Sequence, residues 1–129
     1  MVKRILIVDN EECIRKTGKR FIDAFFKRYK VDMADDGSTA IALMKKNDYS
    51  AIISDYSMPH INGNKLYEWI AQNQPSKVGK FAFAISLQDH DNEDFVKKNK
   101  IRLIPKGVHF MDPYVNALEE ILGEPRATI

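Results

Sequence analysis

The chain has 129 residues and a net charge of +2, which is the size of one domain and too weak a charge balance to indicate nucleic-acid binding. A single cysteine, Cys13, excludes an intrachain disulfide, and no apolar stretch approaches the ~20 residues of a membrane-spanning helix. The apolar run near the start is too short for a signal peptide. These features predict a soluble protein of the reducing cytoplasm that binds no membrane, with Cys13 as a buried thiol.

Short aliphatic or β-branched runs alternate with longer segments of helical periodicity along the whole chain. In chain order we predict a strand over 4–8, a helix over 11–29, a strand over 31–34, a helix over 38–46 and a strand over 49–54, followed by a helix over 65–74, a strand over 81–85, a helix over 93–98, a strand over 101–104 and a helix from 112 to about 122. Ser38 or Thr39 is the expected cap of the second helix. Gly18 inside the first helix indicates a close packing contact, because glycine costs a helix about 1 kcal/mol relative to alanine.

This βα alternation predicts an α/β doubly wound fold with a parallel five-stranded sheet. Right-handed crossovers leave few topologies, of which the flavodoxin-like order 2-1-3-4-5 is the commonest for five strands. Residues 1–123 are expected to form one domain, and residues 124–129 a frayed tail.

Polar side chains follow the predicted strands where each of them ends. Asp9 and Asn10 follow the first strand, Asp55 the third, Ser86 the fourth and Lys106 the fifth. Each residue alone has a structural explanation, such as a turn cap for Asp55 or a surface lysine for Lys106. Because the carboxyl ends of parallel strands meet at one edge, we expect the five side chains to gather there.

Oxygen ligands at neighbouring strand ends suit a hard cation such as Mg²⁺. Asp9, Asn10 and Asp55 would supply side-chain oxygens, and a main-chain carbonyl just after Asp55, that of Ser57, would complete the set. Ser86 offers a hydroxyl and Lys106 a point charge, both suited to the oxygens of a phosphoryl group.

At these residues the sequence resembles the receiver domains of two-component response regulators, over nearly the whole chain. The resemblance is carried by the stretches 5–12, 36–40, 55–63 and 104–106, and its most specific part is the pattern Asp-x-x-Met-Pro-x-x-x-Gly that begins at Asp55. It implies that Asp55 accepts a phosphoryl group from a phosphohistidine, and that Mg²⁺, Ser86 and Lys106 stabilise the transferring group. It also implies an acceptor that hydrolyses its own acyl phosphate, rather than a turnover enzyme.

The same resemblance implies a protein partner. Receivers dock sensor histidine kinases or phosphotransfer proteins largely through the first helix. Seven basic residues lie between Arg15 and Lys30, with Asp23 as the one acid among them. A solvated helix face explains this cluster better than direct nucleic-acid binding, because no aromatic side chains are interleaved with the basic residues on that face. A third interpretation is a docking surface for an acidic protein partner. The resemblance further implies signalling through a phosphorylation-dependent interaction with a downstream protein, which these residues do not identify.

Four residues depart from the family pattern. Asn10 replaces a metal-binding carboxylate, Leu87 stands where a small side chain leaves the phosphoryl pocket open, Leu103 replaces an aromatic that reports phosphorylation, and Gly107 replaces a proline after Lys106. We therefore expect weaker Mg²⁺ binding and slower phosphorylation unless Glu11 compensates. After Lys106 we expect either a trans peptide bond or a locally different loop, and a displacement of the Lys106 side chain is compatible with both.

These departures favour an alternative function, a degenerate receiver that binds a partner without being phosphorylated. A third hypothesis, a haloacid-dehalogenase-like phosphatase, needs a second aspartate two residues after the nucleophile. Ser57 occupies that position, so we discount it.

Overall fold

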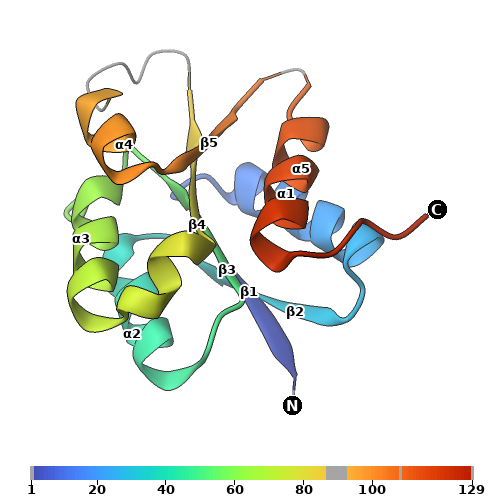
Figure 1. Ribbon diagram of the computed structural model, residues 1–129, viewed down its shortest axis with the longest axis horizontal. Coiled ribbons are helices and arrows are strands. Elements are labelled where there is room, and N and C mark those ends of the chain that lie inside the picture. Colours follow the sequence, from blue (N-terminus) through green and yellow to red (C-terminus); the bar gives the residue numbers. More distant parts are fainter. Residues whose placement is uncertain (1, 87–92, 108, 129) are drawn as a thin grey trace.

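The computed structural model describes residues 2–86, 93–107 and 109–128. Its strands form one parallel sheet in the order β2-β1-β3-β4-β5, with helices on both faces (Figure 1). The strands are β1 (Lys3–Val8), β2 (Tyr29–Ala34), β3 (Ala51–Asp55), β4 (Phe81–Ile85) and β5 (Arg102–Pro105), and the helices are α1 (Glu12–Phe25), α2 (Gly37–Lys46), α3 (Gly63–Asn73), η1 (Pro75–Lys80), α4 (Glu93–Asn99) and α5 (Met111–Leu122). The predicted doubly wound, flavodoxin-like fold is confirmed.

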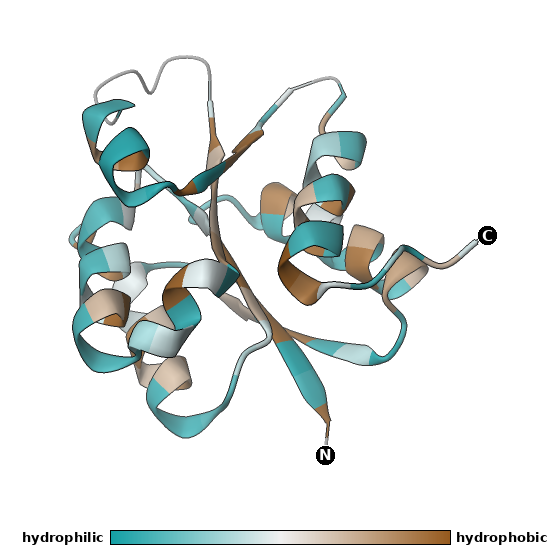
Figure 2. Cartoon of the chain, viewed as in Figure 1, coloured by the Kyte–Doolittle hydropathy of each residue, from teal (hydrophilic) through white to brown (hydrophobic). Residues whose placement is uncertain are grey.

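The central strands are apolar on both faces because each face is covered by helices. In β1, Ile5 and Ile7 pack in the core beneath α1 and α5, whereas Leu6 and Val8 pack in the core beneath α2, α3 and α4. Figure 2 shows the result: apolar residues line the strands in the centre, and hydrophilic residues cover the outer sides of the helices. Within the described ranges, no helix is long and apolar enough to cross a membrane.

Most predicted boundaries lie within two residues of those observed, the short helix η1 was not predicted, and two of the differences have a clear physical reason. The first helix ends at Phe25 rather than near residue 29, because Tyr29 is buried and pairs with Lys3 as the first residue of β2. The second helix is capped by Asp36, whose Oδ1 accepts a hydrogen bond of 2.8 Å from the Thr39 amide, and not by Ser38 or Thr39. A carboxylate also interacts favourably with the positive end of the helix dipole.

The contact expected at Gly18 is present, and it joins α1 to α5. A Cβ at Gly18 would overlap the Tyr114 hydroxyl and lie 3.0 Å from Ile7 Cδ1. After α5, the Ala127 amide donates to Phe25 O at 2.9 Å, and Arg126 interacts with Glu119 at 2.8 Å. The segment after α5 therefore contacts both α1 and α5, while the predicted division at residue 123 stays a prediction.

Candidate functional site

Two carboxylates meet at the carboxyl edge of the sheet, as the strand pattern predicts. Asp9 directly follows β1 and Asp55 is the last residue of β3, and these strands are neighbours with Val8 paired to Ser54. Both acids are buried, with Asp9 1% and Asp55 4% exposed. Two like charges in a desolvated site repel, so this arrangement requires a cation.

Lys106 supplies one positive charge to both acids. Its Nζ lies 3.0 Å from Asp9 Oδ2 and 3.0 Å from Asp55 Oδ1. The Lys106 amide also donates to Ile85 O at 2.9 Å, which extends the pairing of β4 and β5 by one residue and fixes the direction of the side chain. None of the peptide bonds between described residues is cis. The expected trans bond is present, and the displacement of Lys106 that would have been compatible with it is not.

The ionisation of this triad follows from its burial. Burial, followed by repulsion from Asp9, raises the pKa of Asp55 from 3.8 to about 6, although Lys106 and the Ser57 amide act in the opposite direction. Burial alone would lower the pKa of Lys106, but its attraction to Asp9 and Asp55 outweighs this effect and raises the pKa. The Lys106 ammonium therefore stays charged, but its single positive charge cannot balance the negative charges of both Asp9 and Asp55. The site holds an excess of negative charge when both carboxylates are ionised.

Backbone contacts hold Asp9 in place, and the sequence prediction did not include them. The Glu11 amide donates to Asp9 Oδ1 at 2.9 Å, and Arg15 Nη1 donates to Asp9 O at 2.7 Å. Aspartate commonly accepts from the amide two residues later, so the first contact could have been read from the sequence. The second could not, because it depends on how α1 packs against the end of β1.

Gly63 lets the loop after β3 close against the site. Its amide donates to Tyr56 O at 2.8 Å, and an added Cβ would lie 2.9 Å from Asp55 O and 2.5 Å from Phe83 Cε1. Contacts this short are essentially absent from real structures, so a larger residue would push the loop away from Asp55. This requirement explains why a glycine ends the pattern that begins at Asp55.

The other predicted site residues lie at the same edge. Asn10 and Ser57 are exposed, and the Ser57 amide donates to Asp55 Oδ1 at 3.4 Å. Ser86 follows β4 directly and is half-buried, whereas Leu87 lies outside the described residues. Their roles toward a metal or a phosphoryl group remain predictions.

The oxygen donors at this edge fit a divalent cation. Asp9 Oδ2 is buried, and although the Lys106 ammonium is 3.0 Å away, it accepts no hydrogen bond of good geometry from the described residues. Among these residues no group of three His, Cys, Asp or Glu side chains gathers. The carboxylates of Asp9 and Asp55 therefore need an amide or main-chain oxygen to complete a Mg²⁺ site, and Asn10 and Ser57 offer them at this edge.

Two expectations about other residues change with the structure. Cys13 is exposed in the first turn of α1, and not buried as predicted. The basic cluster on α1 is partly neutralised within the helix, because Lys16 pairs with Glu12 at 2.8 Å and Lys19 pairs with Asp23 at 2.6 Å. Both pairs have i,i+4 spacing, which the sequence already contained.

The chain is similar in sequence to known proteins. Residues 5–110 match a family model described as "Response regulator receiver domain". The response regulator MprA of Mycobacterium sp. strain KMS is 35% identical over 129 residues, which is 100% of this chain and 51% of MprA. The chain therefore spans about half the length of the curated relatives that it matches.

Solved structures support the same fold. A response regulator receiver domain protein from Clostridium thermocellum superposes with a TM-score of 0.78 at 19% identity, covering 94% of each chain. The response regulator TrrA of Thermotoga maritima, solved in complex with Mg²⁺-BeF, has a TM-score of 0.75 at 24% identity and covers 93% of this chain and 99% of its own. By sequence match and by fold, the chain belongs to the response regulator receiver domain family.

Proposed function

We propose that Asp55 accepts a phosphoryl group from the phosphohistidine of a sensor histidine kinase or phosphotransfer protein. A carboxylate oxygen of Asp55 bonds to phosphorus, the phosphorus–nitrogen bond to the donor imidazole breaks, and the imidazole leaves with the bonding electrons. The observation that carries this proposal is the buried Asp55 carboxylate at the tip of β3, within 3.0 Å of the Lys106 ammonium.

The surrounding residues would act through charge and position. The Lys106 ammonium interacts with both acids, so it can turn toward a phosphoryl oxygen with a small movement of a flexible side chain. Ser86 would donate its hydroxyl to the same group. Electrostatic stabilisation and positioning account for most of the rate enhancement in phosphoryl transfer.

Mg²⁺ is the proposed cofactor, and Asp9, Asn10, Asp55 and the Ser57 carbonyl are its proposed ligands. When bound, Mg²⁺ supplies positive charge that the site lacks and shields the incoming phosphoryl oxygens from the two carboxylates. Asp55 reacts as the ionised carboxylate, and a nearby cation would reverse the rise of its pKa.

We propose that the kinase or phosphotransfer protein docks beside the site on α1. This helix begins three residues after Asp9, and its Arg15 contacts the Asp9 carbonyl. Lys16 and Lys19 are already paired within the helix, so the position of α1 supports docking more strongly than its charge. We place this exchange in the cytoplasm, where histidine kinases act.

Labelling with a small phosphodonor tests the acceptor. The protein is incubated with labelled acetyl phosphate and Mg²⁺, and we expect an alkali-labile label that is lost in Asp55→Ala. Asp35→Ala changes an exposed aspartate in another loop and serves as the control that keeps the label. A label that persists in Asp55→Ala would overturn the assignment.

One observation favours the alternative, a degenerate receiver that binds a partner without phosphorylation. Lys106 already neutralises part of the charge of Asp9 and Asp55, and the third side-chain ligand, Asn10, is neutral. The absence of a label with acetyl phosphate, with a phosphorylated kinase and with Mn²⁺ in place of Mg²⁺ would favour this function.

A further inference from the structure

A second charged region lies at the amino edge of the sheet, opposite Asp55. The start of β1 and the end of α2 lie at the bottom of Figure 1, and residues of both line adjoining depressions together with residues of η1. Three adjoining depressions of about 500, 540 and 200 Å³ share lining residues in this region, among them Lys46, Lys77 and Ser50. We call this region the amino-edge surface.

The amino-edge surface is strongly basic although the whole chain carries only +2. Its charged lining residues are six cations and one acid, namely Lys3, Arg4, Lys45, Lys46, Lys77, Lys80 and Asp48. Such a concentration of one sign over a concave surface attracts and steers anionic partners.

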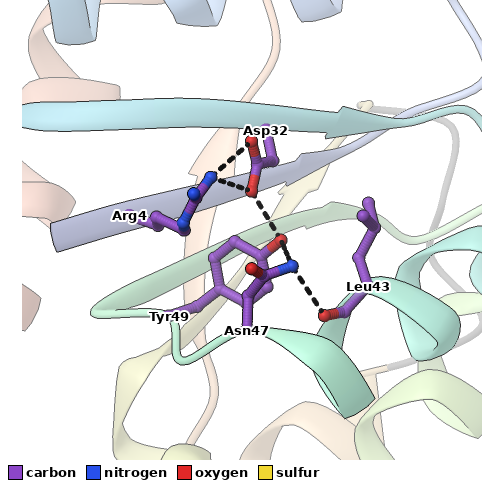
Figure 3. A network of polar contacts seen from close by, with 5 residues as sticks. All are labelled: Arg4, Asp32, Leu43, Asn47 and Tyr49. Atoms are coloured by element: carbon purple, nitrogen blue, oxygen red, sulfur yellow. Dashed lines mark hydrogen bonds and ion pairs between the residues drawn. The ribbon is translucent and has the colours of Figure 1, made fainter. Parts of the chain in front are cut away.

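Internal contacts use some of these cations and leave others available. Arg4 pairs with Asp32 at 3.1 Å, and Asp32 also accepts a hydrogen bond of 2.7 Å from the Tyr49 hydroxyl (Figure 3). Lys77 pairs with Asp48. Within the described ranges, Lys3, Lys45 and Lys46 have no acidic partner, and all three are exposed.

We propose that the amino-edge surface binds an acidic peptide segment of a partner protein. Carboxylates of the segment would pair with Lys3, Lys45 and Lys46. Val2, which is 64% exposed beside them, provides an apolar contact for a neighbouring side chain. The arrangement is open and its cations are separate lysines rather than convergent arginines, which suits an extended chain better than a small anion.

The neutral groups of the surface favour a peptide over a nucleic acid. The amide nitrogen of Asn47 donates to Leu43 O at 3.2 Å (Figure 3). The amide nitrogen of Gln74 donates to Met44 O at 2.8 Å. The carbonyl oxygens of the two side chains accept no hydrogen bond from the residues that the structure describes, so they are available to a ligand. A peptide backbone brings N–H donors to such acceptors, whereas the phosphates of a nucleic acid bring only more acceptors.

This binding is independent of phosphoryl transfer because the surface and Asp55 lie at opposite edges of the sheet. Fluorescence anisotropy is measured with a fluorescein-labelled peptide of Asp, Glu and Ala, a matched peptide of Asn, Gln and Ala, and an oligodeoxynucleotide of equal net charge. We expect the acidic peptide to bind, the neutral peptide not to bind, and the oligonucleotide to bind more weakly.

Two charge-reversal variants locate the site. The double variant Lys45→Glu, Lys46→Glu should weaken binding of the acidic peptide roughly tenfold, because two attractions become two repulsions. Lys97→Glu, Lys98→Glu makes the same charge change in the last turn of α4, and should leave the affinity within about twofold. Both variants should keep the acetyl phosphate label if they are folded.

The outcomes separate the proposal from nonspecific attraction. Equal weakening by the two double variants, tighter binding of the oligonucleotide, or absence of acidic-peptide binding would each overturn it. Circular dichroism of each variant confirms that a loss of binding is not a loss of folding. Because labelling of Asp55 is measured separately, failure of this proposal is distinguishable from failure of the phosphoryl-acceptor proposal.

Discussion

Replacing Asp55 by asparagine should stabilise the metal-free protein while abolishing phosphoryl acceptance. In the folded state burial and Asp9 raise the pKa of Asp55 from 3.8 to about 6. Each pKa unit corresponds to 1.36 kcal/mol, so ionised Asp55 costs the folded state about 3 kcal/mol. Asp55 as a residue is only 4% exposed, so solvent screening does not reduce this cost.

The pH dependence gives the sign of this effect. At a pH below 3.8, Asp55 is protonated in the folded and unfolded states and costs nothing. As the pH rises from 3.8 toward 6, the unfolded chain loses its proton first, so the wild type loses stability relative to Asp55→Asn. Above a pH of about 6 the difference should level off at about 3 kcal/mol.

Urea unfolding of both proteins in EDTA across this pH range measures the difference. Asp35→Asn changes an exposed aspartate and should show no comparable stabilisation. Adding Mg²⁺ should stabilise the wild type more than Asp55→Asn, since only the wild type keeps the complete ligand set. A stability difference in EDTA that is independent of pH, or a destabilised Asp55→Asn, would refute the electrostatic account of the site.

Three further variants test other parts of the structure. Asn10→Asp restores a carboxylate next to Asp9 and should tighten Mg²⁺ binding about tenfold by calorimetric titration; an unchanged dissociation constant would show that Asn10 does not face the metal. Lys106→Met removes the cation between Asp9 and Asp55 and should lower the free energy of unfolding by about 3 kcal/mol at neutral pH. The loss of stability should be smaller at a pH below the pKa of Asp55, and a loss that does not depend on pH would argue against the ion pairs. Gly18→Ala would place a Cβ against the Tyr114 hydroxyl and should cost about 2 kcal/mol. Tyr114→Phe removes a buried hydroxyl that has no hydrogen-bond partner among the described residues and should stabilise the fold by about 1 kcal/mol. The double variant should be more stable than the sum of the two effects predicts, and strict additivity in urea unfolding would mean that the two side chains do not interact.

The sheet edge could be predicted because strand ends are visible in the sequence. Asp9, Asp55 and Lys106 each follow an apolar run, and the parallel topology alone brings such residues together. The topology in turn follows from the alternation of strands and helices.

The errors arose where tertiary contacts outweighed local patterns. Helical periodicity continued past Phe25, but pairing of Tyr29 with Lys3 began β2 instead. The lone Cys13 was expected in the core on the average behaviour of its residue type, yet it lies on the outer side of α1. The contact of Arg15 with Asp9 depends on the packing of α1 and carried no signal in the sequence.

Identification of the phosphorylated residue tests the central claim most directly. The protein is incubated with acetyl phosphate and Mg²⁺, the acyl phosphate is reduced with borohydride, and the peptides are sequenced by mass spectrometry. We predict homoserine at position 55 and unmodified aspartate at position 9. Unmodified Asp55, or homoserine at Asp9 instead, would contradict the account.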